Sequence, residues 1–112
     1  MLGDLSEVIV HVDDMERMTA FYRDVLGLEP DVTGDWWTTF PTGAAMLALH
    51  GGGRIGSHNV RFNFDVDDLD AVRAELDARG VELSEVREPV AGVRVCDGTD
   101  PEGNVFTLEA RR

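Results

Sequence analysis

The sequence predicts an α+β fold of two tandem βαβββ modules, whose strands form a curved mixed sheet around a cavity with the helices on the outer face. The first observation is an internal repeat, because Val12–Glu16 (Val-Asp-Asp-Met-Glu) returns as Val66–Asp70 (Val-Asp-Asp-Leu-Asp). The second is that each copy follows alternating apolar residues, as in a strand with one buried face. The third is that each copy opens a segment with apolar residues at helical spacing.

In the first half, these patterns predict a strand over Glu7–Val12 and then a helix. Asp13 and Glu16 have the spacing of a capping box at the start of that helix, and Gly27 can end it in a left-handed conformation. Met15 and Met18 fall on its apolar stripe and are interpreted as core residues. The β-rich remainder predicts strands over Trp36–Phe40 and Met46–His50, with a turn at 41–43 between them.

The second half repeats this order. A strand is predicted over Arg61–Val66, and either Asp67 or Asp68 caps a helix that ends at Gly80. Its apolar stripe consists of Leu69, Val72 and Leu76. The remaining strands are predicted over Val81–Leu83, Val93–Val95 and Asn104–Leu108.

The length and net charge of the chain limit the number of domains and the classes of partner. The chain has 112 residues, the size of a single domain over 1–112, with module one at about 1–54 and module two at about 57–112. Residues 51–56 read as a glycine-rich linker between the modules. The 10 basic and 22 acidic residues give a net charge of −12, which argues against nucleic acid and anionic membranes as partners and permits a cationic small molecule.

The cysteine content and the N-terminal sequence indicate the chemistry open to the thiol and the cellular location. Cys96 is the single cysteine, so no intramolecular disulfide can form and no cysteine-rich zinc site is possible. Its neighbour Asp97 disfavours a reactive thiolate. The N-terminus has neither a basic region nor a long apolar run, so we expect no signal peptide and a cytoplasmic protein.

Several sequence motifs resemble those of the vicinal oxygen chelate superfamily, which includes glyoxalase I, extradiol dioxygenases, and fosfomycin and bleomycin resistance proteins. They are Val12–Met15 followed by Phe21–Leu28 (Phe-Tyr-Arg-Asp-Val-Leu-Gly-Leu), Phe64–Asp70 followed by Ala78–Val81, and Asp100–Val105 (Asp-Pro-Glu-Gly-Asn-Val). Together these cover essentially the whole chain. The resemblance implies the paired-module fold, but this fold hosts many chemistries, so function has to be argued from the site.

The resemblance also implies four positions at which the family's metal enzymes carry ligands. In this chain they are Glu7, either Leu47 or Ala48, Arg61 and Thr107. Arg61 stands where those enzymes usually have histidine, and Thr107 where they usually have glutamate. Arginine is always charged and has no lone pair to donate, so we predict no bound metal and no other cofactor. We expect Glu7 and Arg61 to face each other as an ion pair in the metal's place.

The three histidines offer other candidates. His11 shares a strand face with Glu7 and is expected in the same cavity, whereas His50 joins it only if Ala48 faces inward. His58 follows the glycine segment and is expected in solvent. Trp36 and Trp37 are adjacent in a strand, so one indole should face the cavity and the other should lie outside or at a dimer contact.

These residues predict a metal-independent small-molecule binding protein, similar to the bleomycin-resistance branch, with an expected role in resistance to an antibiotic or toxic metabolite by sequestration. The alternative is a glyoxalase-like lyase or isomerase, or a dioxygenase-related enzyme, in which Glu7 or His11 acts as base on a small carbonyl substrate. A vestigial pocket in an accessory subunit is a third alternative. The expected ligand is cationic or aromatic, and the resemblance implies a homodimer. The expected binding residues are Glu7, His11, Trp36, Trp37, Arg61, Asn63, Thr107 and Glu109.

Overall fold

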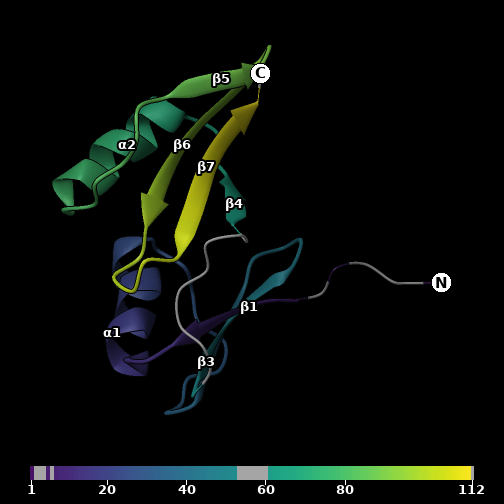
Figure 1. Ribbon diagram of the computed structural model, residues 1–112, viewed down its shortest axis with the longest axis vertical. Coiled ribbons are helices and arrows are strands. Elements are labelled where there is room, and N and C mark those ends of the chain that lie inside the picture. The colour runs from purple at the N-terminus through teal and green to yellow at the C-terminus, as the bar shows by residue number, and fades with distance from the viewer. Residues whose placement is uncertain (2–4, 6, 53–60, 112) are drawn as a thin grey trace. The chain divides into compact units, whose positions relative to one another are not determined.

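The chain divides into two compact units, Met1–Gly56 and Ser57–Arg112, shown in Figure 1. This computed structural model describes residues 1, 5, 7–52 and 61–111. His58 and most of the predicted linker lie outside the described residues. Each unit is described by itself below. No helix in the described part of the chain is long and apolar enough to cross a membrane.

The first unit holds a three-stranded sheet and one helical segment. The strands are β1 (Glu7–Val12), β2 (Trp37–Pro41) and β3 (Met46–Gly51), in the order β1-β3-β2. β1 runs parallel to β3, and β2 runs antiparallel to it. The parallel pair needs a crossover, which contains the helices α1 (Met15–Ala20) and η1 (Phe21–Val25).

The second unit holds a four-stranded sheet in the order β4-β7-β6-β5. β4 runs parallel to β7, while β6 is antiparallel to both β5 and β7. The helix α2 (Leu69–Ala78) follows β4 and lies over one face of this sheet in Figure 1. The strands are β4 (Phe62–Asp65), β5 (Arg87–Val90), β6 (Val93–Thr99) and β7 (Val105–Arg111).

Each helix begins at the second aspartate of its repeat. Asp14 accepts a hydrogen bond from the Arg17 backbone N–H at 3.1 Å, and Asp68 accepts one from Ala71 at 3.0 Å. The predicted capping box of Asp13 and Glu16 is therefore wrong for α1, because the cap lies one residue later. The helix then widens to a π-helix, with the Leu26 N–H bonded to the Phe21 carbonyl at 3.0 Å.

The core of each unit lies between its sheet and its helix. In the first unit, Met18 and Tyr22 of the helical segment are fully buried with Phe40 and Leu49 of the sheet, which confirms the predicted core role of Met18. The buried Thr38 hydroxyl lies 3.0 Å from that of Thr19 on α1. In the second unit, the buried side chains include Leu69 and Leu76 of α2, Cys96 of β6, and Phe106 and Leu108 of β7.

The α+β class and the repeat of a strand, a helix and further strands are confirmed. The first unit is one strand shorter than a full module, because its remaining strand is reduced to a bridge between Val32 and Thr39. The strand predicted over Val81–Leu83 is wrong, since only Leu83 forms a bridge, to Gly98. The strand that pairs with β6 opposite β7 is β5, in which Pro89 and the charged residues Arg87 and Glu88 obscure the strand pattern.

A tight turn between β6 and β7 contains the Asp-Pro-Glu-Gly-Asn phrase. The Asp100 carboxylate is 4% exposed and accepts hydrogen bonds from the backbone N–H groups of Glu102 and Asn104, both at 2.9 Å. It also accepts one from the Asn104 side-chain amide at 2.7 Å. Gly103 adopts φ +87°, a left-handed conformation that glycine enters without strain. This sequence motif therefore has a structural role, since it stabilises the turn.

Candidate functional site

Each sheet has one face covered by its helix and one face, here called the open face, that its own helix leaves free. In the first sheet, Val10, Val12 and Leu49 are buried on the helix face. Because side chains alternate along a strand, Glu7, Ile9 and His11 of β1 point to the open face. The register aligns Glu7 with Met46, Ile9 with Ala48 and His11 with His50, so Ala48 and not Leu47 lies on the open face.

An aromatic cluster occupies this open face. Trp37 pairs with His50 across β2 and β3, and their ring centroids are 3.7 Å apart. The His11 and His50 ring centroids are 6.0 Å apart in an edge-on arrangement. The buried His50 Nε2 atom has no hydrogen-bond partner among the described residues. Trp36 precedes β2, is 73% exposed, and lies against the backbone of Gly51, so the two indoles have separate environments.

The open face of the second sheet is polar. The register aligns Asn63 with Thr107 and Asp65 with Glu109, and it aligns Thr107 with Asp97 of β6. Their neighbours in sequence, including Phe64, Phe106 and Cys96, occupy the opposite, helix-covered face. The open face therefore carries the polar row of Asn63, Thr107 and Asp97, with Val95 beside Glu109.

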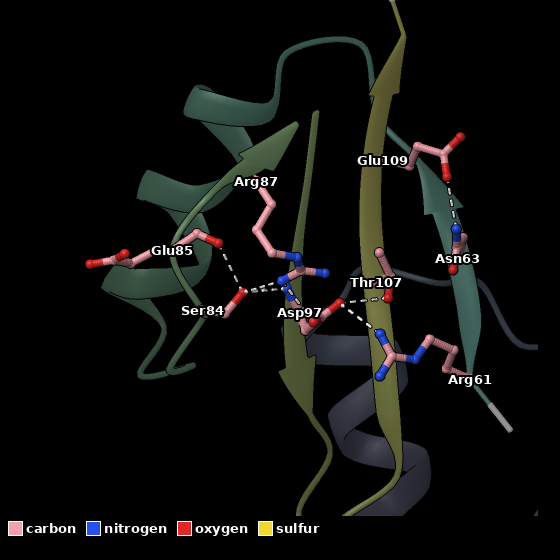
Figure 2. A network of polar contacts seen from close by, with 8 residues as sticks. All are labelled: Arg61, Asn63, Ser84, Glu85, Arg87, Asp97, Thr107 and Glu109. Atoms are coloured by element: carbon pink, nitrogen blue, oxygen red, sulfur yellow. Dashed lines mark hydrogen bonds and ion pairs between the residues drawn. The ribbon is translucent and has the colours of Figure 1, made fainter. Parts of the chain in front are cut away.

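Asp97 is the centre of the network in Figure 2. Its Oδ1 accepts a hydrogen bond from the Thr107 hydroxyl at 2.7 Å and lies 3.6 Å from Nη1 of Arg61. Its Oδ2 lies 2.9 Å from Nη1 of Arg87. The Ser84 hydroxyl accepts a hydrogen bond from the Asp97 backbone N–H at 2.9 Å and lies 3.3 Å from the same Arg87 nitrogen.

This environment lowers the pKa of Asp97. Burial alone raises it, because a charged group loses solvation in the protein, but hydrogen bonds from Arg87 and Thr107 and the charges of Arg87 and Arg61 outweigh that effect. Asp97 is therefore ionised throughout the neutral range.

Glu109 is the second carboxylate of this face and is 8% exposed. Its Oε2 accepts a hydrogen bond from the Asn63 side-chain amide at 2.7 Å. Its Oε1 lies 2.5 Å from Nη2 of Arg111. With one arginine to one carboxylate, this pair is electrically balanced.

The predicted site residues thus fall into two groups, one on each open face. Glu7, His11 and Trp37 belong to the first sheet. Arg61, which directly precedes β4, belongs to the second unit with Asn63, Thr107 and Glu109. The expected Glu7–Arg61 ion pair joins different units and stays a prediction, whereas the structure pairs Arg61 with Asp97.

Sequence reasoning missed Asp97 and Arg87 as site residues. Asp97 was considered only as a neighbour of Cys96, and Arg87 lies in the strand that was not predicted. The alternation of Val93, Val95 and Asp97 was the available signal, because it sets Asp97 on the face opposite Cys96. Cys96 itself is fully buried, and burial raises the pKa of its thiol, so it is no candidate nucleophile.

Two grooves within the units lie elsewhere. One of about 510 Å³ is lined by Met15, Thr19 and Arg23 of the first helical segment together with residues 33–35 and Thr38. One of about 310 Å³ lies beside α2, against Asp70, Arg73 and Leu83. Neither contains a predicted site residue.

The four family ligand positions do not fit a divalent cation. With the register known they are Glu7, Ala48, Arg61 and Thr107, of which only Glu7 offers a carboxylate. Arg61 is a cation paired with Asp97, and the Thr107 hydroxyl donates to the same carboxylate. Among the described residues, no group of three or more histidine, cysteine, aspartate or glutamate side chains could hold a metal ion.

The repeat, and two sheets of which one has an aromatic and the other a mainly polar open face, define the chain as a protein with two βαβ-type units. The family model for the Glyoxalase/Bleomycin resistance protein/Dioxygenase superfamily matches residues 5–108. The chain belongs to this superfamily. No curated protein matches the sequence significantly.

Solved structures share the fold at low identity. TnmS3, an antibiotic binding protein from a Streptomyces species, is 24% identical with a TM-score of 0.85 over 99% of this chain and 98% of its own. Lactoylglutathione lyase from Agrobacterium tumefaciens is 24% identical with a TM-score of 0.81, over 97% and 94%. The fosfomycin resistance protein FosX from Listeria monocytogenes is 22% identical with a TM-score of 0.82, over 100% and 96%.

Proposed function

We propose that this protein binds and sequesters a small organic molecule without a metal ion. The observation that carries the proposal is that Arg61 forms an ion pair and Thr107 a hydrogen bond with Asp97. Both residues stand at positions where metal enzymes of the superfamily have metal ligands. A guanidinium there repels a cation and attracts ligand oxygens. The similarity in fold to an antibiotic binding protein and to a fosfomycin resistance protein supports a resistance role.

The proposed binding residues form an aromatic part in the first unit and a polar part in the second, each proposed as a ligand-binding surface by itself. Trp37 supplies a flat apolar wall for an aromatic ligand, with His11 and Glu7 on the same open face. The polar part consists of Arg61, Asn63, Thr107 and Glu109. Further parts of the proposal are a homodimer and a cytoplasmic location.

Elemental analysis of native, untagged protein dialysed without chelator is the first test. We expect no stoichiometric transition metal, and a stoichiometric one would overturn metal independence. A thermal-shift and tryptophan-fluorescence screen of aromatic compounds and antibiotics then tests binding. Trp37→Phe should abolish the fluorescence response, whereas Trp36→Phe, the matched control one residue away, should keep it. A response that depends on Trp36 would argue against the proposed surface.

A glyoxalase-like lyase or isomerase is the second candidate, favoured by the unpartnered Nε2 atom of His50 beside His11. In this mechanism, Glu7 or His11 removes a proton from the carbon next to the carbonyl group of the substrate. Pyruvate in D₂O provides the test, because a base of this kind exchanges its methyl protons for deuterium. Exchange that is lost in Glu7→Gln or His11→Asn supports the enzyme, and its absence supports sequestration.

A further inference from the structure

We infer that the ligand carries a singly charged oxyanion, such as a carboxylate, and that Arg87 keeps Arg61 available for this group by occupying Asp97. The inference rests on the proposed function and deepens it. It assigns the chemical class of the ligand and gives Arg87 the role of a positioning residue, which acts on the ligand through Asp97 and Arg61.

The two arginines hold Asp97 unequally. Arg87 lies 2.9 Å from Oδ2, a normal length for a charge-assisted hydrogen bond. Arg61 lies 3.6 Å from Oδ1, which already accepts the Thr107 hydroxyl at 2.7 Å. Because both carboxylate oxygens of Asp97 have closer partners, the contact with Arg61 is the weakest of the three that this carboxylate makes with Arg61, Arg87 and Thr107 (Figure 2).

Arg87 is itself fixed in this position. Its Nη1 lies 3.3 Å from the Ser84 hydroxyl, and that hydroxyl accepts a hydrogen bond from the Asp97 backbone at 2.9 Å. The Ser84 backbone N–H also donates to the Asp97 carbonyl at 2.8 Å. Arg87 and Asp97 are thus tied to the same short segment, so their pair needs no rearrangement when a ligand binds.

Among the described residues, the charged partners of Asp97 leave one positive charge unbalanced. Two guanidinium groups face one carboxylate, whereas the neighbouring Glu109 is balanced by Arg111. Asp65 shares the open face, but it lies four residues from Arg61 along the chain, which is about 13 Å in a strand. The Arg61 side chain is 58% exposed, and its planar fork of donors matches the two oxygens of a carboxylate.

The decisive experiment titrates benzoate, benzamide and benzylamine into the protein, observed through the guanidinium NMR signals of arginine and the indole signals of tryptophan. Benzoate should shift the Arg61 signal saturably and bind at least about tenfold more tightly than benzamide, since only benzoate forms charge-assisted hydrogen bonds. Arg61→Gln should remove this preference.

A double-mutant cycle tests the role of Arg87. In Arg87→Gln, Asp97 is free to pair with Arg61, so benzoate affinity should fall about tenfold. Asp97→Asn should not weaken benzoate binding, and adding Arg87→Gln to it should change the affinity by less than about twofold. Arg87→Lys, which keeps the charge, should retain most of the affinity. Arg94→Gln is the control, because Arg94 pairs with Asp70 on the helix face of the same sheet.

The outcomes separate the two proposals. An equal effect of Arg87→Gln with and without Asp97→Asn would overturn the positioning role, because simple charge loss acts equally in both. Binding of all three probes at Trp37 with no preference for benzoate would overturn the oxyanion assignment and leave the proposed function standing. Failure of every probe, and of the wider aromatic screen, would overturn both.

Discussion

Replacing Asp100 by alanine should lower the free energy of unfolding by about 3–5 kcal/mol. The carboxylate is 4% exposed and accepts three hydrogen bonds, from Glu102 and twice from Asn104. A hydrogen bond to a charged group contributes about 1.5–3 kcal/mol, and bonds that share one carboxylate are not additive, so the total falls below the simple sum. Alanine also leaves buried donors of the turn without partners.

Asp100→Asn provides a graded comparison, because its amide oxygen can still accept the two backbone N–H groups bound by Oδ1. It cannot accept the Asn104 amide as well, so we expect a loss of about 1.5–2 kcal/mol. Urea unfolding followed by far-UV circular dichroism measures both, with Asp77→Asn on the exposed surface of α2 as the control. A loss below about 1 kcal/mol for Asp100→Ala would refute the structural role of the turn.

Three further predictions concern the second unit. The pKa of Asp97 is lowered in the folded state, so its stabilising contribution is present above the unfolded-state pKa of about 3.9 and is lost as the pH falls through the folded-state pKa. In urea unfolding, the free energies of unfolding of wild type and Asp97→Asn should therefore differ more at pH 7 than at pH 3. An unchanged difference would contradict this. In Gly98→Ala, the new Cβ would lie 2.6 Å from Phe106, so thermal unfolding should report a loss of about 1–3 kcal/mol, while Gly34→Ala should be nearly neutral. Cys96 should react with a thiol reagent only after unfolding, and rapid labelling of the native protein would show that its burial is wrong.

The repeat made the fold predictable because its signals are local. Each copy places alternating residues before an aspartate cap and a helical stripe, and all of these act within a few residues. The exact cap was not predictable, since Asp13 and Asp14 are chemically alike and only the backbone decides which one accepts the Arg17 N–H. The strand β5 was missed because a proline within a run argues against a strand.

The candidate site was predictable only in part. Strand alternation placed Glu7 and His11 on one face of β1, in agreement with the observed register. The partner of Arg61 was not predictable, because Asp97 lies 36 residues away in sequence and reaches it through the pairing of β6 with β7. Interactions of this kind depend on register, which a single sequence does not specify.

The proline in β5 also disfavours aggregation of the protein at high concentration. β5 forms one edge of the four-stranded sheet, and an edge strand offers unpaired backbone groups to any extended chain that approaches it. Pro89 has no backbone N–H to donate, and Glu88 beside it carries a charge in a chain of net charge −12. Strand addition at this edge, the first step of sheet-to-sheet aggregation, is thereby disfavoured even when the protein accumulates.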